Sequence, residues 1–172
     1  MDDGALYNLT AFSMCAHNGT HIDAPSHFIN DGKTVKEIPL YKTTGKAYVT
    51  TFDGVLDEKD AAGILNKAEE RDPEYGKRIL LKGNATVSEN AARVFADKGI
   101  YLIGNESQTV GPEDAPMKVH LILLEKEVVL LEGIRLENVP EGEYLLSAQP
   151  INTGESDGAP CRAILIKEEK RT

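Results

Sequence analysis

Residues 17–28 read HNGTHIDAPSHF and hold three of the four histidines of the chain. The spacing is H-x3-H-x-D-x3-H, with the carboxylate of Asp23 between the last two histidines. Histidine nitrogens and carboxylate oxygens are the ligands of zinc and similar divalent metals. Gly19 permits a tight turn, and in an extended segment His21 and Asp23 point to the same side. The stretch therefore predicts a metal site.

The alternative is that these histidines are separate surface or core residues on a polar loop. That interpretation suits a lone histidine better than three within eleven positions beside an aspartate. The zinc-protease pattern HExxH is excluded, because Asn18 occupies its glutamate position. A metal site remains the favoured interpretation.

The same stretch resembles the signature HxGTHxDxPxHF of the cyclase-like metal hydrolases, which include bacterial kynurenine formamidase and isatin hydrolase. All fixed positions of that signature are present. The resemblance implies an α/β protein with a single mixed domain of the swivelling β/β/α type. It also implies that His17, His21 and Asp23 bind metal and that His27 is the catalytic acid/base.

Two further ligands are implied by the same resemblance. Family members complete the metal centre with a histidine on a helix and a glutamate twelve residues later, and His120 and Glu132 have that spacing. From the surroundings alone, His120 is more readily interpreted as a core residue on an apolar helix face than as a ligand. Glu132 would then be a solvated residue at a strand end.

Five ligands are more than one tetrahedral zinc takes from a protein, so they fit two metals bridged by Asp23. The expected cofactor is one or two divalent ions, zinc first and manganese second. Such a site polarises the substrate carbonyl and supplies hydroxide at neutral pH. The resemblance suggests amide substrates, namely an aryl formamide or cyclic amide such as N-formylkynurenine.

Composition bounds the class of protein. The 172 residues suit one domain, here taken as residues 1–172, with 41% hydrophobic and 27% charged residues. The net charge of −9 argues against nucleic acid, and no apolar run approaches the ~20 residues that span a bilayer. No signal peptide is visible, and the thiols of Cys15 and Cys161 are interpreted as structural rather than nucleophilic. We therefore expect a cytoplasmic protein that takes a small-molecule substrate.

Strands and helices are expected to alternate along the middle of the chain. Asp57 and Ser88 are plausible N-caps, and Gly99 ends the second helix. A long loop is expected from Gly19 to Gly32, and two strands are expected around a glycine-rich loop after residue 141. The expected strands are 5–16, 46–53, 77–83, 101–104 and 128–133, and the expected helices are 58–70, 88–99 and 116–126.

Two loops carry weaker resemblances. In residues 104–116, Glu106 and Thr109 stand where family members usually have aspartate and serine, and a solvated helix cap is the alternative role for this loop. Near the C-terminus, residues 154–163 resemble the closing G-x-x-G-x-P-x-R-A pattern. Arg162 there either pairs with a buried carboxylate or lines the loop.

The start of the chain departs from the family. Relatives usually begin with a further stretch near the substrate, so we expect an N-terminal piece to be missing or truncated here. An unprotected first strand would invite pairing with another chain. Together with the resemblance, this predicts a homodimer or higher homo-oligomer.

Three functions compete at this point. The first is the metal-dependent amide hydrolase, and the second is a metal- or ligand-binding relative without turnover. The third is a scaffold in which the histidines are incidental. Retention of His27, which no structural metal site needs, favours turnover.

Overall fold

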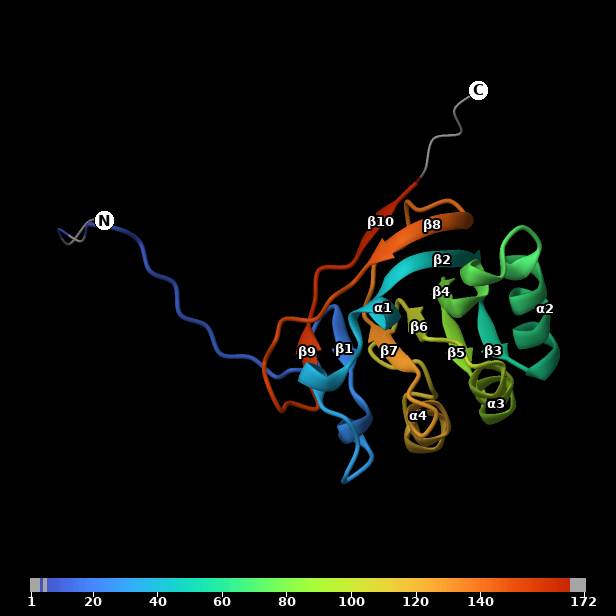
Figure 1. Ribbon diagram of the computed structural model, residues 1–172, viewed down its shortest axis with the longest axis horizontal. Helices are drawn as coiled ribbons and strands as arrows, with labels where there is room; N and C mark the ends of the chain where they lie inside the picture. The colour runs from blue at the N-terminus through green and yellow to red at the C-terminus, as the bar shows by residue number, and fades with distance from the viewer. Residues whose placement is uncertain (1–3, 5, 168–172) are drawn as a thin grey trace.

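The computed structural model describes residue 4 and residues 6–167, and its frame is one eight-stranded mixed sheet (Figure 1). The strand order is β10-β8-β2-β4-β6-β7-β1-β9, and strands β2, β4, β6 and β7 run parallel. Antiparallel strands complete both ends. The sheet strands are β1 (His21–Asp23), β2 (Thr44–Thr51), β4 (Arg78–Lys82), β6 (Leu102–Asn105), β7 (Val129–Glu132), β8 (Gly142–Ser147), β9 (Gly158–Pro160) and β10 (Ile164–Ile166).

Three helices lie together on one face of this sheet (Figure 1). They are α2 (Glu58–Glu69), α3 (Glu89–Lys98) and α4 (Met117–Leu124), with a short α1 (Leu40–Thr43) before β2. Strands β3 (Gly54–Leu56) and β5 (Ala85–Val87) form a separate parallel pair. The expected single mixed α/β domain is confirmed. Among the described residues, no helix is long and apolar enough to cross a membrane.

The helix ends follow from capping chemistry. Asp57 accepts hydrogen bonds from the backbone N–H groups of Lys59 and Asp60, at 2.8 and 2.9 Å, and starts α2 as expected. Ser88 accepts from Ala91 N–H at 3.2 Å and starts α3. Gly99 ends that helix with φ of 67°, a left-handed conformation that glycine adopts without steric cost.

Three of the expectations about secondary structure are wrong. No strand forms between residues 6 and 16, which run away from the sheet as an exposed extended arm (Figure 1); residue 5 lies outside the described residues. The arm has residues suited to a strand, but none of the described strands pairs with it. The expected loop from Gly19 to Gly32 contains strand β1, which the long-range pairing with β7 and β9 creates. The last part of the chain forms β8, β9 and β10, one strand more than expected.

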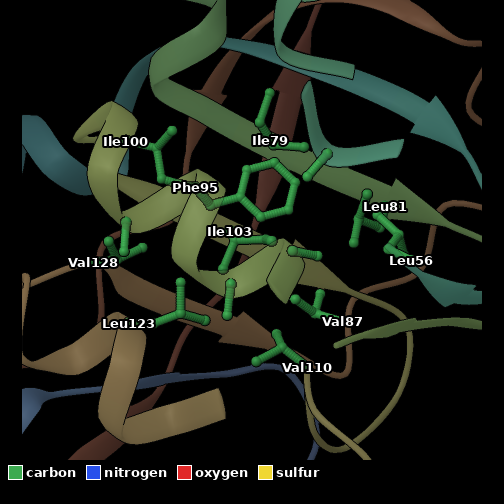
Figure 2. Close-up of a cluster of buried hydrophobic side chains, with 14 of the residues drawn as sticks. Leu56, Ile79, Leu81, Val87, Phe95, Ile100, Ile103, Val110, Leu123 and Val128 are labelled. Atoms are coloured by element: carbon green, nitrogen blue, oxygen red, sulfur yellow. The ribbon is translucent and has the colours of Figure 1, made fainter. Parts of the chain in front are cut away.

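The larger apolar core lies between the sheet and the helices, with Phe95 of α3 at its centre (Figure 2). Phe95 is fully buried among Ile79, Ile100 and Ile103 (Figure 2). A second apolar cluster covers the opposite face of the sheet and includes Ile22 of β1. Because β1 buries Ile22 on that face, His21 and Asp23 point to the helix side.

Replacement of Phe95 by alanine is expected to lower the free energy of unfolding by about 3–5 kcal/mol, because it leaves a cavity in a packed core. Urea unfolding would measure the loss. Val55→Ala is the matched control, since Val55 is 66% exposed and its replacement should change stability by about 0.5 kcal/mol or less. Equal losses in the two variants would contradict this view of the core.

Candidate metal centre

Strand β1 lies between β7 and β9 and carries the centre of the site. His21 is paired directly with Glu132 of β7, and Asp23 is paired with Gly158 of β9. Directly paired residues project from the same face of a sheet. The register therefore places His21, Asp23 and Glu132 together, and all three are at most 2% exposed.

Helix α4 brings His120 to the same point. His120 Nε2 lies 3.3 Å from Glu132 Oε1 and 3.5 Å from Asp23 Oδ2, while His21 Nε2 lies 3.5 Å from Glu132 Oε2. Segments about a hundred positions apart thus converge on one pair of carboxylates. His120 is not an ordinary core histidine, and Glu132 is not a solvated strand end.

Backbone carbonyls set the orientation of two of these rings. His21 Nδ1 lies 3.0 Å from Gly19 O, and His120 Nδ1 lies 2.9 Å from Pro116 O. A carbonyl oxygen only accepts, so each Nδ1 donates and each Nε2 faces the carboxylates. Ring nitrogens fixed in this way are typical of metal-ligating histidines.

Loop residues orient the glutamate as well. Val110 N–H donates to Glu132 Oε1 at 2.8 Å, and the Asn105 side chain donates to Thr109 O at 2.7 Å. The loop of residues 104–116 therefore supports the site through its backbone. Glu106 acts elsewhere: it accepts from the N–H groups of Gly83 and Leu136 and ties two loops together.

His17 and His27 form the more open side of the cluster. Their rings are stacked, with centroids 3.9 Å apart and 25° between the ring planes. His17 Nδ1 lies 2.7 Å from Asp23 Oδ1, and its Nε2 lies 3.0 Å from Asp157 Oδ2. His27, from the short helix Pro25–His27, has a side chain that is 27% exposed. It therefore adjoins the buried centre without being enclosed by it.

The sequence did not single out Asp157 as a site residue. It lies in the glycine-rich loop before β9, and its Oδ2 also lies 3.3 Å from His27 Nδ1. It belongs to the closing segment that weakly resembles the family pattern, but nothing local gives it a role, because its partners are 130 and 140 positions earlier in the chain. Arg162 is exposed and has no carboxylate within ion-pair distance among the described residues, so it lines the loop.

Electrostatics in the cluster are strongly perturbed. Burial by itself would raise the pKa of Asp23, but the surrounding histidines hold that pKa well below its usual range. Burial raises the pKa of Glu132, and the nearby charge of Asp23 adds to the rise. The hydrogen bond to Asp23 raises the pKa of His17 to about 9 despite partial burial. Burial opposes protonation of His120, yet contacts with Asp23 and Glu132 raise its pKa to about 9.

The donor set fits a divalent metal. Asp23 Oδ2 is buried and has no hydrogen-bond partner among the described residues, and its contact with His120 Nε2 is a long one of 3.5 Å. A buried carboxylate oxygen without a partner is costly unless a cation meets it. Two groups of three residues each offer ligand atoms that all lie within 4.8 Å of one another. One group is His17, Asp23 and His27. The other is His21, Asp23 and Glu132, so Asp23 belongs to both.

Fold and site together define a mixed α/β protein with a buried histidine–carboxylate centre at one end of its sheet. Comparison with known proteins agrees: the Cyclase family model, described as "Putative cyclase", matches residues 3–112. The chain is 32% identical over 178 residues to kynurenine formamidase of Erythrobacter litoralis, covering 96% of this chain and 80% of that protein. The chain belongs to the Cyclase family.

Solved structures show the same fold. A structure described as a potential metal-dependent hydrolase with cyclase activity matches with a TM-score of 0.79 and 30% identity, covering 91% of this chain and 82% of that one. An isatin hydrolase bound to the product analogue thioisatinate matches with a TM-score of 0.82 and 18% identity, covering 98% and 79%. At that identity the second match speaks for the fold alone.

The raised histidine pKa values predict how stability depends on pH without metal. Protons bound by His17 and His120 stabilise the folded state below the unfolded pKa of 6.5, and this contribution is lost as pH rises through about 9. The free energy of unfolding of chelator-treated protein should therefore fall over that range. Urea titrations at several pH values would measure it, and the His17→Gln variant should show a shallower fall. A parent protein whose stability rises over the range would contradict the assignment.

Proposed function

We propose that this chain is a metal-dependent amide hydrolase that acts on an aryl formamide or cyclic amide, with N-formylkynurenine as the model substrate. The observation that carries the proposal is the convergence of three histidines on the buried pair Asp23 and Glu132, with His27 beside them. Amide hydrolysis is also the activity that the name of the kynurenine formamidase relative describes.

In this proposal His17, His21, Asp23, His120 and Glu132 hold one or two divalent ions. Zinc is the first choice and manganese the second, because both accept imidazole and carboxylate ligands. Asp23 lies with His17 in one group of ligand atoms and with His21 and Glu132 in the other, so it would be shared if two ions were held. His27 also belongs to the first group, but in this proposal it is the acid/base. When bound, such an ion polarises a carbonyl group and makes water a better nucleophile near neutral pH.

His27 is proposed as the acid/base. Its ring stacks on that of His17, and its centroid lies 4.5 Å from the centroid of the Phe28 ring, with 84° between those two planes. A ring in this position takes a proton from the attacking water and gives it to the departing amine nitrogen as the C–N bond breaks. The products are a carboxylic acid and an amine, joined in one molecule when the amide is cyclic.

A binding protein without turnover is the second candidate. It needs the buried ligands but not a partly exposed histidine next to them. The partial exposure of His27 beside the buried ligands favours hydrolysis. Metal content measured beside turnover separates the two functions.

His27→Ala should leave metal content near that of the parent and lower turnover of an aryl formamide about 10²–10⁴-fold, the usual contribution of a positioned acid/base. His21→Ala should remove metal and activity together, because a ligand is lost. Elemental analysis and turnover on the same variants are the measurements. If His27→Ala also lost its metal, His27 would be a ligand. Full turnover in that variant would leave the mechanism without its acid/base.

Self-association is a further part of the proposal. Leu6, Leu9 and Phe12 of the arm are 92%, 87% and 78% exposed, an unusual set for a segment in water. Strands β9 and β10 end the sheet within the described residues and leave edges that another chain can pair with. These features support a homodimer or higher oligomer.

A cytoplasmic location is also proposed, and the free thiols of Cys15 and Cys161 suit it. The hydrolase domain is proposed to extend over residues 1–172.

Sedimentation at micromolar concentration should show the parent protein as a dimer or larger species. The double variant Leu9→Ser, Phe12→Ser should shift it towards monomer, because it removes apolar surface that association would bury. Val55→Ser, at an exposed residue remote from the arm in sequence, is the control and should not change the distribution. A monomeric parent would contradict self-association.

A further inference from the structure

Asp157 stands between the two histidines on the open side of the cluster. One of its carboxylate oxygens, Oδ2, lies 3.0 Å from His17 Nε2 and 3.3 Å from His27 Nδ1. Its side chain is 49% exposed, so it forms the outer wall of a site whose inner wall is Asp23. Nothing in the ligand set described above requires a carboxylate at this place.

The backbone around Asp157 is held firmly. Asp157 O accepts from Ala24 N–H at 2.9 Å, and Ser156 O accepts from Val35 N–H at 2.9 Å. Gly158 packs directly against His17: a Cβ there would come within 2.5 Å of the ring carbon Cε1. The carboxylate is thus placed by contacts that do not involve its own side chain.

We propose that Asp157 is a positioning residue for His27, an inference that rests on the proposed acid/base role of that histidine. A carboxylate accepts hydrogen bonds, so His27 Nδ1 donates its hydrogen to Asp157 and the other nitrogen, Nε2, carries the lone pair. Nε2 is then the atom that takes up and releases the substrate proton. Asp157 remains ionised throughout and stabilises the imidazolium that forms, as in other histidine–carboxylate pairs.

Because Asp157 Oδ2 contacts both histidines, Asp157 could act through His17 instead of His27. If Asp157 acts mainly through His17, its loss should weaken metal binding. If it acts through His27, its loss should lower turnover and leave the metal in place. The two effects must be measured separately, because the rings of His17 and His27 are stacked and both contact one oxygen of Asp157. His17 Nε2 and His27 Nδ1 each lie within hydrogen-bond distance of Asp157 Oδ2.

The test compares Asp157→Ala and Asp157→Asn in the metal-loaded full chain. We expect kcat to fall about 10- to 100-fold in the alanine variant, a usual effect for a residue that orients a functional histidine. KM and metal content should stay near the parent values. The asparagine variant should recover part of the loss, because its amide oxygen still accepts from Nδ1. Glu155→Ala is the control from the same loop and should match the parent, since Glu155 pairs only with the exposed Lys36 among the described residues.

A double-variant cycle adds a second criterion. If Asp157 and His27 act as one unit, adding Asp157→Ala to the His27→Ala variant should cause almost no further loss of turnover. Loss of metal in Asp157→Ala, unchanged kcat, or full additivity with His27→Ala would each overturn the proposal.

A readout without turnover separates this inference from the proposed function. Nitrogen NMR of the zinc-loaded protein should show His27 protonated at Nδ1 in the parent and a mixture of tautomers in Asp157→Ala. A parent protein that hydrolyses no amide would refute the proposed function, yet the tautomer would still report on Asp157. An unchanged tautomer in the alanine variant would refute the positioning role even in an active enzyme.

Discussion

The burial of two carboxylates side by side is the constraint on which the rest of this structure depends. Asp23 and Glu132 are each at most 2% exposed, and burying like charges together is costly unless cations meet them. Three histidines surround the pair. They lower the pKa of Asp23, and the carboxylates in turn raise the pKa values of His17 and His120. Removing one partner would leave a buried charge uncompensated, so the cluster holds its own geometry as well as providing a site for metal.

Sheet register is what makes that burial possible. His21 is opposite Glu132, and Ile22 between His21 and Asp23 enters the apolar cluster on the other face. A slip by one residue would exchange these faces and place the ligands in an apolar core. The three-residue strand β1 therefore depends on its neighbours β7 and β9 rather than on its own propensity. The fold and the site are specified by the same set of pairings.

The same dependence explains what could be predicted from the sequence. The capped helices and the buried parallel strands have local signals, and those predictions were confirmed to within a few residues. Strand β1 was interpreted as part of a loop because glycine and proline punctuate the segment from Gly19 to Gly32. Pairing with β7 and β9 overrides that local signal. The arm of residues 6–16 has the opposite character: its residues suit a strand, but no described strand of the sheet pairs with it. The expected ligand residues are brought together, although their roles were implied by resemblance rather than by local chemistry. The place of Asp157 in the site could not be predicted, because only the folded chain brings it to His17 and His27.

The closing segment of the chain shows how a weak motif acquires physical meaning. Gly158 is required because the His17 ring lies against its backbone, and Ala159 is fully buried opposite Ile22. Pro160 is paired with His21 at the end of the same short ladder. These residues close the outer side of β1, and Asp157 directly before them supplies the carboxylate that the two open histidines share. The N-terminal histidine stretch is thus incomplete as a site without a segment about 140 positions later. That segment packs Gly158 against the His17 ring and places the Asp157 carboxylate beside His27.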